Sequence, residues 1–164
     1  MNSFTHFGVY GICEQAGKLL VINKGRGPYT GRSDLPGGRL EENEGLADAL
    51  VREFMEETGL AISVEDNLGT FDFFIRYQED DFTHMHHIAA LFKVAPDIDQ
   101  SAAEIAIFAE QDSLGALWIE LKGITLESAT PVAVLAAEWL LTGRLPTGTG
   151  YHNDWVVQQL PEKQ

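Results

Sequence analysis

The alternation of apolar and polar positions predicts several strands along this chain. Residues 7–13 and 18–22 are rich in valine, isoleucine, leucine and aromatic side chains, and a polar stretch, Glu14-Gln15-Ala16-Gly17, separates them. This arrangement is typical of a β-hairpin. Further strands are predicted at residues 61–64, 71–77, 84–94 and 117–121, with an acidic turn at residues 78–81.

Two segments have the period of an amphipathic helix. In residues 44–58, about 100° per residue gathers Ala47, Leu50, Val51, Phe54 and Thr58 into a core-facing stripe. Asn43 is the expected N-cap of this helix, and Gly59 lies where a left-handed residue would end it. Residues 128–141 predict a second helix, with Pro131 in its first turn and Gly143 at its end.

Length and composition favour one globular domain over residues 1–164. The chain is 45% hydrophobic, and its net charge of −14 disfavours a nucleic-acid polymer or an anionic membrane as partner. Its single cysteine, Cys13, suits a reducing cytoplasm. The N-terminus lacks a signal-peptide pattern, and residues 131–141 fall short of the roughly 20 apolar residues that span a bilayer. We therefore expect a cytoplasmic protein.

Three carboxylates, Glu53, Glu56 and Glu57, are expected to gather on one side of the first helix, away from its apolar stripe. Like charges at this spacing repel by roughly 0.2–0.5 kcal/mol per pair. Arg52 reaches Glu56 at i+4, but one guanidinium does not neutralise three acids. A hard divalent cation, Mg²⁺ or Mn²⁺, would do so better. The alternative interpretation is a solvated acidic face.

Cations are concentrated just before this helix. Residues 23–39 are dense in glycine and proline and hold four of the chain's 11 basic residues, which are Lys24, Arg26, Arg32 and Arg39. In so acidic a chain, this predicts an anion site beside the cation site. The alternative is a loop kept in solution by its charges.

The spacing in residues 38–60 resembles the Nudix box. Gly38, Glu44, the run Arg52-Glu53-Phe54, the pair Glu56-Glu57, and Gly59-Leu60 occupy every defined position of that motif. The resemblance implies the Nudix fold, an α/β (α+β) arrangement in which a mixed β-sheet is flanked by helices. It also implies a Mg²⁺- or Mn²⁺-dependent hydrolase that cleaves the pyrophosphate bond of a nucleoside diphosphate linked to a group X, by attack of a metal-activated water.

The resemblance also suggests roles for individual residues. The metal ligands would be the Gly37 carbonyl and the side chains of Glu53, Glu56 and Glu57. Glu53 is the first choice for the general base, and Glu104 or Glu110, from an acidic segment outside the box, are alternatives. Arg52 would orient the acids, and Glu44 would support the metal site or the helix start. Arg26, Arg32, Arg39 and Tyr77 are the predicted substrate-binding residues.

The nature of X stays open at this point. Some ADP-sugar hydrolases of the family carry a proline shortly after the box, whereas none occurs here between Leu60 and Pro96. Dinucleoside polyphosphate hydrolases often carry a tyrosine near the position of Tyr77, 18 residues after Gly59. One alternative function is a nucleotide-sensing module without turnover, but such modules tend to lose box carboxylates and this chain keeps them all. A second is isoprenoid diphosphate isomerisation, for which Cys13 has no partner motif.

Two further features allow more than one interpretation. His84, His86 and His87 lie on one predicted strand, where alternation puts His84 and His86 on one face and His87 on the other. Two imidazoles are too few ligands for a transition metal, so we favour packing or substrate contact for these residues. The C-terminal tail carries Trp155 and is either an edge strand or an oligomer contact. Homodimers are common in the family that the chain resembles.

Overall fold

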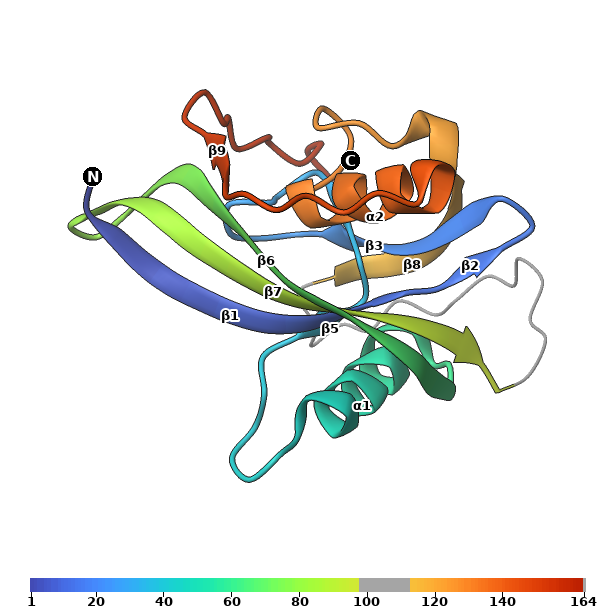
Figure 1. Cartoon of the computed structure of the whole chain (residues 1–164). Helices are drawn as coiled ribbons and strands as arrows, with labels where there is room; N and C mark the ends of the chain where they lie inside the picture. The colour runs from blue at the N-terminus through green and yellow to red at the C-terminus, as the bar shows by residue number, and fades with distance from the viewer. Residues whose placement is uncertain (98–112, 164) are drawn as a thin grey trace.

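Two helices lie on opposite sides of a pair of β-sheets (Figure 1). The computed structural model describes residues 1–97 and 113–163. In chain order the elements are β1 (Ser3–Ile12), β2 (Glu14–Gln15), β3 (Lys18–Lys24), β4 (Ser33–Asp34), β5 (Gly37–Gly38), α1 (Leu46–Thr58), β6 (Ile62–Glu79), β7 (Phe82–Pro96), β8 (Ser113–Glu120), the 3₁₀ helix η1 (Leu121–Gly123), α2 (Pro131–Thr142) and β9 (Gly150–His152).

The larger sheet is mixed. Its strand order is β5-β1-β7-β6-β9, with β1 parallel to β7, β6 antiparallel to β7, and β9 parallel to β6. In the smaller sheet β3 pairs with β8 and also with the short strands β2 and β4. The predicted α/β (α+β) fold is confirmed, although the strands divide into two sheets.

The predicted hairpin between residues 7–13 and 18–22 forms only at its tip. β2 pairs with the start of β3, and Ala16 and Gly17 make the turn with positive φ angles of 51° and 77°. β1 leaves this ladder and runs parallel to β7, from Ser3 opposite His84 to Ile12 opposite Lys93. Apolar alternation predicts a strand but does not choose its partner, which explains the error.

Residues 61–64 and 71–77 belong to one strand, β6, and not to two. Along β6 the register with β7 shifts between Val64 and Asp66 and again between Asn67 and Gly69. An extra residue in one strand bends it and reverses the alternation of side chains beyond that point. The polar segment between the two predicted strands is therefore extended backbone.

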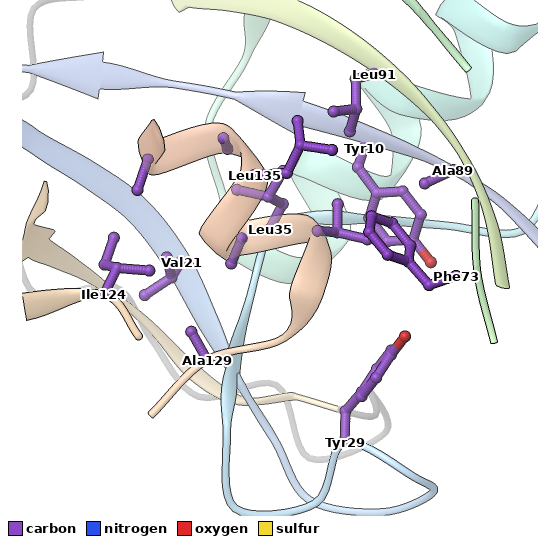
Figure 2. Close-up of a cluster of buried hydrophobic side chains, with 14 of the residues drawn as sticks. Tyr10, Val21, Tyr29, Leu35, Phe73, Ala89, Leu91, Ile124, Ala129 and Leu135 are labelled. Atoms are coloured by element: carbon purple, nitrogen blue, oxygen red, sulfur yellow. The ribbon is translucent and has the colours of Figure 1, made fainter. Parts of the chain in front are cut away.

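Each helix covers its own hydrophobic cluster. The cluster under α1 includes Leu20 and Ile22 of β3. The cluster under α2 includes Leu19 and Val21 of the same strand, and Figure 2 shows Val21 among its side chains. The apolar run in β3 is continuous because both faces of the strand are covered. Each of these fully buried side chains contributes about 1.5–3 kcal/mol relative to exposure.

Helix α1 begins later than predicted. Its N-cap is Gly45, while Asn43, the predicted cap, precedes the helix in a left-handed conformation with φ 61°. The prediction for the other end is confirmed, because Gly59 has φ 73° and donates its N–H to the carbonyl of Met55.

The buried face of α1 is also rotated from the predicted stripe. Leu50, Phe54 and Thr58 are buried as expected, but Ala47 is exposed and Val51 is 39% exposed. Their places are taken by two further residues, Ala49 and Glu57. A buried glutamate is not part of an apolar periodicity, so this face was not visible from hydrophobic spacing.

Helix α2 ends as predicted, but it begins at Pro131 and not at residue 128. Thr130 caps it by accepting a hydrogen bond from the N–H of Ala133, Pro131 follows in the first turn, and Gly143 ends it with φ 72°.

Within residues 1–97 and 113–163, no helix is long and apolar enough to cross a membrane.

The C-terminal tail packs on its own chain. β9 is the predicted edge strand and pairs with Phe73–Ile75 of β6. Trp155 is only 8% exposed, and its indole N–H donates to the carbonyl of Pro28 at 2.9 Å. The proposed oligomer contact through Trp155 is therefore wrong, because the ring is used inside the molecule.

Candidate active site

Two glycines bring strand β1 and helix α1 into close contact. Gly37 pairs with Tyr10 and Gly38 with Val9 in the β1–β5 ladder. Gly37 has φ 151°, and a Cβ there would overlap the carbonyl oxygen of Val9. A Cβ on Gly38 would lie 2.8 Å from the carboxylate carbon of Glu53. Glycine at both positions therefore makes room for the acid against the backbone.

Glu57 is the most buried acid of the helix. Its side chain accepts a 2.8 Å hydrogen bond from the N–H of Gly37, and the residue is 3% exposed. Burial raises the pKa of Glu57 to about 8, against the lowering effect of the Gly37 N–H and Lys24, while Glu53 and Asp34 raise it further. Burial therefore disfavours the ionised form of Glu57, and a nearby cation would favour it.

Arg52 links the remaining acids. Its Nη1 donates to Glu53 at 3.0 Å and to Glu56 at 3.2 Å, and its Nη2 donates to the backbone carbonyl of Arg39 at 3.0 Å. Burial raises the pKa of Glu53, and the bond from Arg52 partly offsets this. The expected orienting role of Arg52 agrees with these contacts.

Glu44 forms a bidentate ion pair with Arg52. The two carboxylate oxygens lie 2.7 Å from Nε and 2.8 Å from Nη2, and one of them also accepts from the N–H of Glu41 at 3.0 Å. The Arg52 guanidinium lowers the pKa of Glu44 to about 2. Glu44 thus holds both the arginine and the loop before the helix.

The acids are held by these partners rather than by one another. In the part of the chain that the structure describes, no three His, Cys, Asp or Glu side chains converge as they would around a metal ion. Glu53 and Glu56 bond to Arg52, and Glu57 bonds to Gly37. Glu104 and Glu110, the alternative bases, lie outside the described residues.

A cleft of about 380 Å³ lies next to these acids. Its lining includes three cationic side chains, Lys24, Arg26 and Arg39, and four aromatic ones, Phe4, Tyr10, Tyr29 and Tyr77. Tyr10 of the lining pairs with Gly37 in the β1–β5 ladder, and the carbonyl of Arg39, also in the lining, accepts a hydrogen bond from Arg52, so this end of the cleft adjoins the box. The geometry joins a carboxylate cluster to a cationic, aromatic cleft.

A family model of the NUDIX domain matches residues 3–140. The chain belongs to the Nudix family. The loop, helix and loop of its box are the segment from β5 through α1 to Gly59, in which the glycines and acids described above occupy the motif positions.

Two curated relatives match this Nudix chain over shorter stretches. An ADP-ribose pyrophosphatase of Methanocaldococcus jannaschii is 43% identical over 63 residues, which are 38% of this chain and 37% of that protein. A low-salt glycan biosynthesis protein of Haloferax volcanii is 35% identical over 89 residues, 54% of this chain and 56% of that protein. The chain thus matches only 37% of the length of the first relative and 56% of the second.

Solved structures resemble the Nudix chain over most of its length. A MutT protein from Bacillus halodurans has a TM-score of 0.61 at 21% identity and covers 94% of this chain and 95% of its own. A MutT NUDIX hydrolase from Burkholderia pseudomallei has a TM-score of 0.58 at 25% identity and covers 82% of this chain and 97% of its own. These likenesses support the same fold.

Three of the four predicted substrate-binding residues, Arg26, Arg39 and Tyr77, line the cleft, but Arg32 does not. Arg32 is 7% exposed, and its guanidinium donates to the carbonyls of Leu126 at 2.9 Å and Val156 at 2.8 Å. It also lies over the ring of Trp155, at 3.9 Å from the centroid. These contacts use the guanidinium of Arg32 to hold the tail, and its predicted role in substrate binding stays a prediction.

The histidines are separated by strand alternation, as expected. His86 stacks on Phe74 at 4.1 Å and pairs with Asp72 at 2.7 Å, whereas His87 is fully buried on the opposite face. Packing is therefore confirmed for both.

Sequence reasoning missed several residues of the site. Tyr10, Tyr29 and Asp34 line the cleft, and Asp34 is 2% exposed while accepting bonds from the N–H of Leu35 and the hydroxyl of Thr130. Tyr10 stands in an apolar stretch of the sequence and Asp34 in the stretch rich in glycine and proline, where neither differs from ordinary core or turn residues. Only Lys24 carried a sequence signal, as part of the cationic loop.

Proposed function

We propose that this Nudix chain hydrolyses the pyrophosphate bond of a nucleoside diphosphate linked to a group X, in a reaction that depends on Mg²⁺ or Mn²⁺. The observation that carries the proposal is the junction of two features. The half-buried Glu53 is joined through Arg52 to the carbonyl of Arg39, and Arg39, Lys24 and Arg26 line the cleft, while Glu57 is buried against Gly37. A diphosphate needs both a cation-binding acid cluster and basic side chains around it.

The donor set fits a hard divalent cation. Carboxylate and carbonyl oxygens are the ligands that Mg²⁺ and Mn²⁺ prefer, and Glu53, Glu56, Glu57 and the Gly37 carbonyl would supply them. The raised pKa values of Glu53 and Glu57 reflect buried negative charge that a cation would offset. When bound, such an ion neutralises the diphosphate and makes water a better nucleophile.

Glu53 is suited to the general base. Its Oε1 is held by Arg52, while among the described residues no donor bonds to its Oε2. Oε2 can therefore accept a proton from the attacking water, and the raised pKa of Glu53 makes it a better proton acceptor than an ordinary glutamate. Arg52, fixed by Glu44, keeps Oε1 in place during this transfer.

The basic residues of the cleft bind the substrate. Arg39 lies at the start of the box, next to the acids, and its carbonyl is bonded to Arg52. We assign Lys24 and Arg39 to the diphosphate, and Arg26 with Tyr77 to the group attached to it. An oxygen-rich anion also agrees with a protein whose net charge of −14 repels polyanions outside such a site.

The test is turnover of a panel of nucleotide sugars and dinucleotides with Mg²⁺ or Mn²⁺. We expect release of two phosphorylated products from at least one member, with no release when a chelator is present. The variant Glu57→Gln should lower the rate of release by roughly 10²–10³-fold, whereas Glu42→Gln, at an exposed acid just before the helix, should leave it unchanged. No turnover of any member together with tight nucleotide binding would identify a sensor module instead.

A further inference from the structure

A continuous chain of side-chain hydrogen bonds runs along the floor of the cleft. Arg39 Nε lies 3.1 Å from Nδ1 of His6, and Nε2 of His6 lies 3.3 Å from the hydroxyl of Tyr10. The Tyr10 hydroxyl is 2.9 Å from Nε2 of His87, and Nδ1 of His87 is 2.6 Å from the hydroxyl of Tyr29. Four of these residues line the cleft, and His87 is buried behind them.

The donor at the head of the chain sets its direction. Arginine only donates, so Nδ1 of His6 accepts, and the proton of the neutral ring is on Nε2, which donates to Tyr10. The Tyr10 hydroxyl therefore donates onward to Nε2 of His87. Burial keeps His87 neutral by lowering its pKa well below the usual range, so its Nδ1–H donates to Tyr29.

This direction leaves the hydroxyl proton of Tyr29 unused. Its oxygen accepts from His87, and the hydrogen bonds of residues 1–97 and 113–163 include no acceptor for its own proton. Burial raises the pKa of Tyr29 well above the usual range, so the proton is retained. Figure 2 shows the hydroxyl groups of Tyr10 and Tyr29 pointing into the same space.

The ring of Tyr29 is fixed from the opposite side. Trp155 meets it edge-on at 5.7 Å between centroids and holds the preceding residue, Pro28, through a hydrogen bond of 2.9 Å. The Tyr29 hydroxyl shares the His87 ring with the Tyr10 hydroxyl, and Tyr10 pairs with Gly37 at the entry to the box, so the Tyr29 hydroxyl belongs to the end of the cleft near the box. A ligand atom that meets this hydroxyl thus lies on or beside the diphosphate.

We propose that Tyr29 determines specificity by donating a hydrogen bond to an acceptor oxygen of the bound nucleoside diphosphate derivative. Tyr10 and His87 are positioning residues, since all their hydrogen-bonding groups are used within the chain. The chemical class of the ligand rests on the proposed function, whereas the direction of the hydrogen bonds from Arg39 to Tyr29 does not. The acceptor is an oxygen either of the diphosphate or of the sugar attached to it.

The test compares the affinity of variants for two nonhydrolysable probes, α,β-methylene adenosine diphosphate and a methylene analogue of a nucleotide sugar, by calorimetry. Tyr29→Phe should weaken binding by roughly tenfold, the effect of one lost hydrogen bond to an anionic or sugar oxygen. Equal loss for both probes assigns the acceptor to the diphosphate, and loss confined to the second assigns it to the sugar. Val132→Ala, in the core under α2, serves as a control for lost stability.

Tyr10→Phe adds a test of the direction itself. Without the Tyr10 proton, His87 is free to take the other tautomer and accept from Tyr29. The probe that Tyr29→Phe weakens should therefore also bind Tyr10→Phe less tightly, but by a smaller factor than it loses in Tyr29→Phe. The double variant should bind no worse than Tyr29→Phe alone. Wild-type affinity of Tyr29→Phe, or an equal loss in Val132→Ala, would overturn the proposal. If wild type binds the probes but turns over nothing, only hydrolysis is refuted; if it binds neither, both proposals fail.

Discussion

The N–H of Gly37 and the carboxylate of Glu57 are joined by a 2.8 Å hydrogen bond across 20 residues of sequence. This bond ties the last turn of α1 to the turn that enters the box. It holds a buried acid against backbone that only glycine can provide, because Gly37 has φ 151°. The proposed chemistry therefore depends on a structural contact as much as on the acid.

Replacing Glu57 by glutamine should separate activity from stability. Glutamine keeps an acceptor for the Gly37 N–H and cannot take on the charge that burial disfavours, so thermal stability in chelator should be unchanged or higher. Activity with Mg²⁺ should fall by roughly 10²–10³-fold, as expected for loss of a charge-stabilising group. Hydrolysis assays and thermal unfolding check the two halves. Retained hydrolysis would remove Glu57 from the proposed metal site.

Alanine at the two glycines of β5 should affect different properties, turnover at Gly38 and stability at Gly37. A methyl group on Gly38 meets only the movable carboxylate of Glu53, at 2.8 Å, so Gly38→Ala should impair turnover while unfolding changes little. A methyl group on Gly37 meets the backbone of Val9 in a conformation unfavourable for alanine, so Gly37→Ala should lower the free energy of unfolding by about 1–3 kcal/mol. Urea unfolding and kcat measurements distinguish them, and equal stability losses would contradict this account.

The ion pair of Glu44 and Arg52 should make stability depend on pH in the acid range. The pKa of Glu44 is lowered to about 2 from its ordinary value of 4.5, so the folded state binds this proton less readily than the unfolded chain. Its contribution is complete above about pH 4.5 and is lost as the pH falls towards about 2. The stability difference between wild type and Glu44→Gln should therefore shrink below about pH 4.5. A difference that is constant with pH would exclude this ion pair as its cause.

Two arginines of the same loop should respond differently to substitution. Arg32→Lys loses the bonds to Leu126 and Val156 and the stacking on Trp155, so it should lower the melting temperature while KM changes little. Arg26→Gln, at an exposed position in the cleft lining, should raise KM several-fold, roughly as for one charged phosphate contact, with little change in melting. Kinetics and thermal unfolding test the two variants. A raised KM in Arg32→Lys would instead show that Arg32 binds the substrate.

The sequence alone determined the family and the segment that carries the chemistry. The offsets from Gly38 to Leu60 are local, and a helix converts them directly into neighbouring side chains, which is why Arg52, Glu53, Glu56 and the end at Gly59 were predicted. The rotation of the buried face of α1 was not predicted, because Glu57 is buried through a hydrogen bond to Gly37 and is not part of the apolar periodicity.

Only the tertiary structure decided which distant residues form the cleft. Tyr10, Tyr29 and His87 come from three separate segments and meet because β1 pairs with β7 instead of completing its hairpin. The structure also placed Arg32 against Trp155 and away from the cleft. Local spacing encodes a motif, but the pairing of strands is a choice among long-range alternatives that depends on burial of the whole chain.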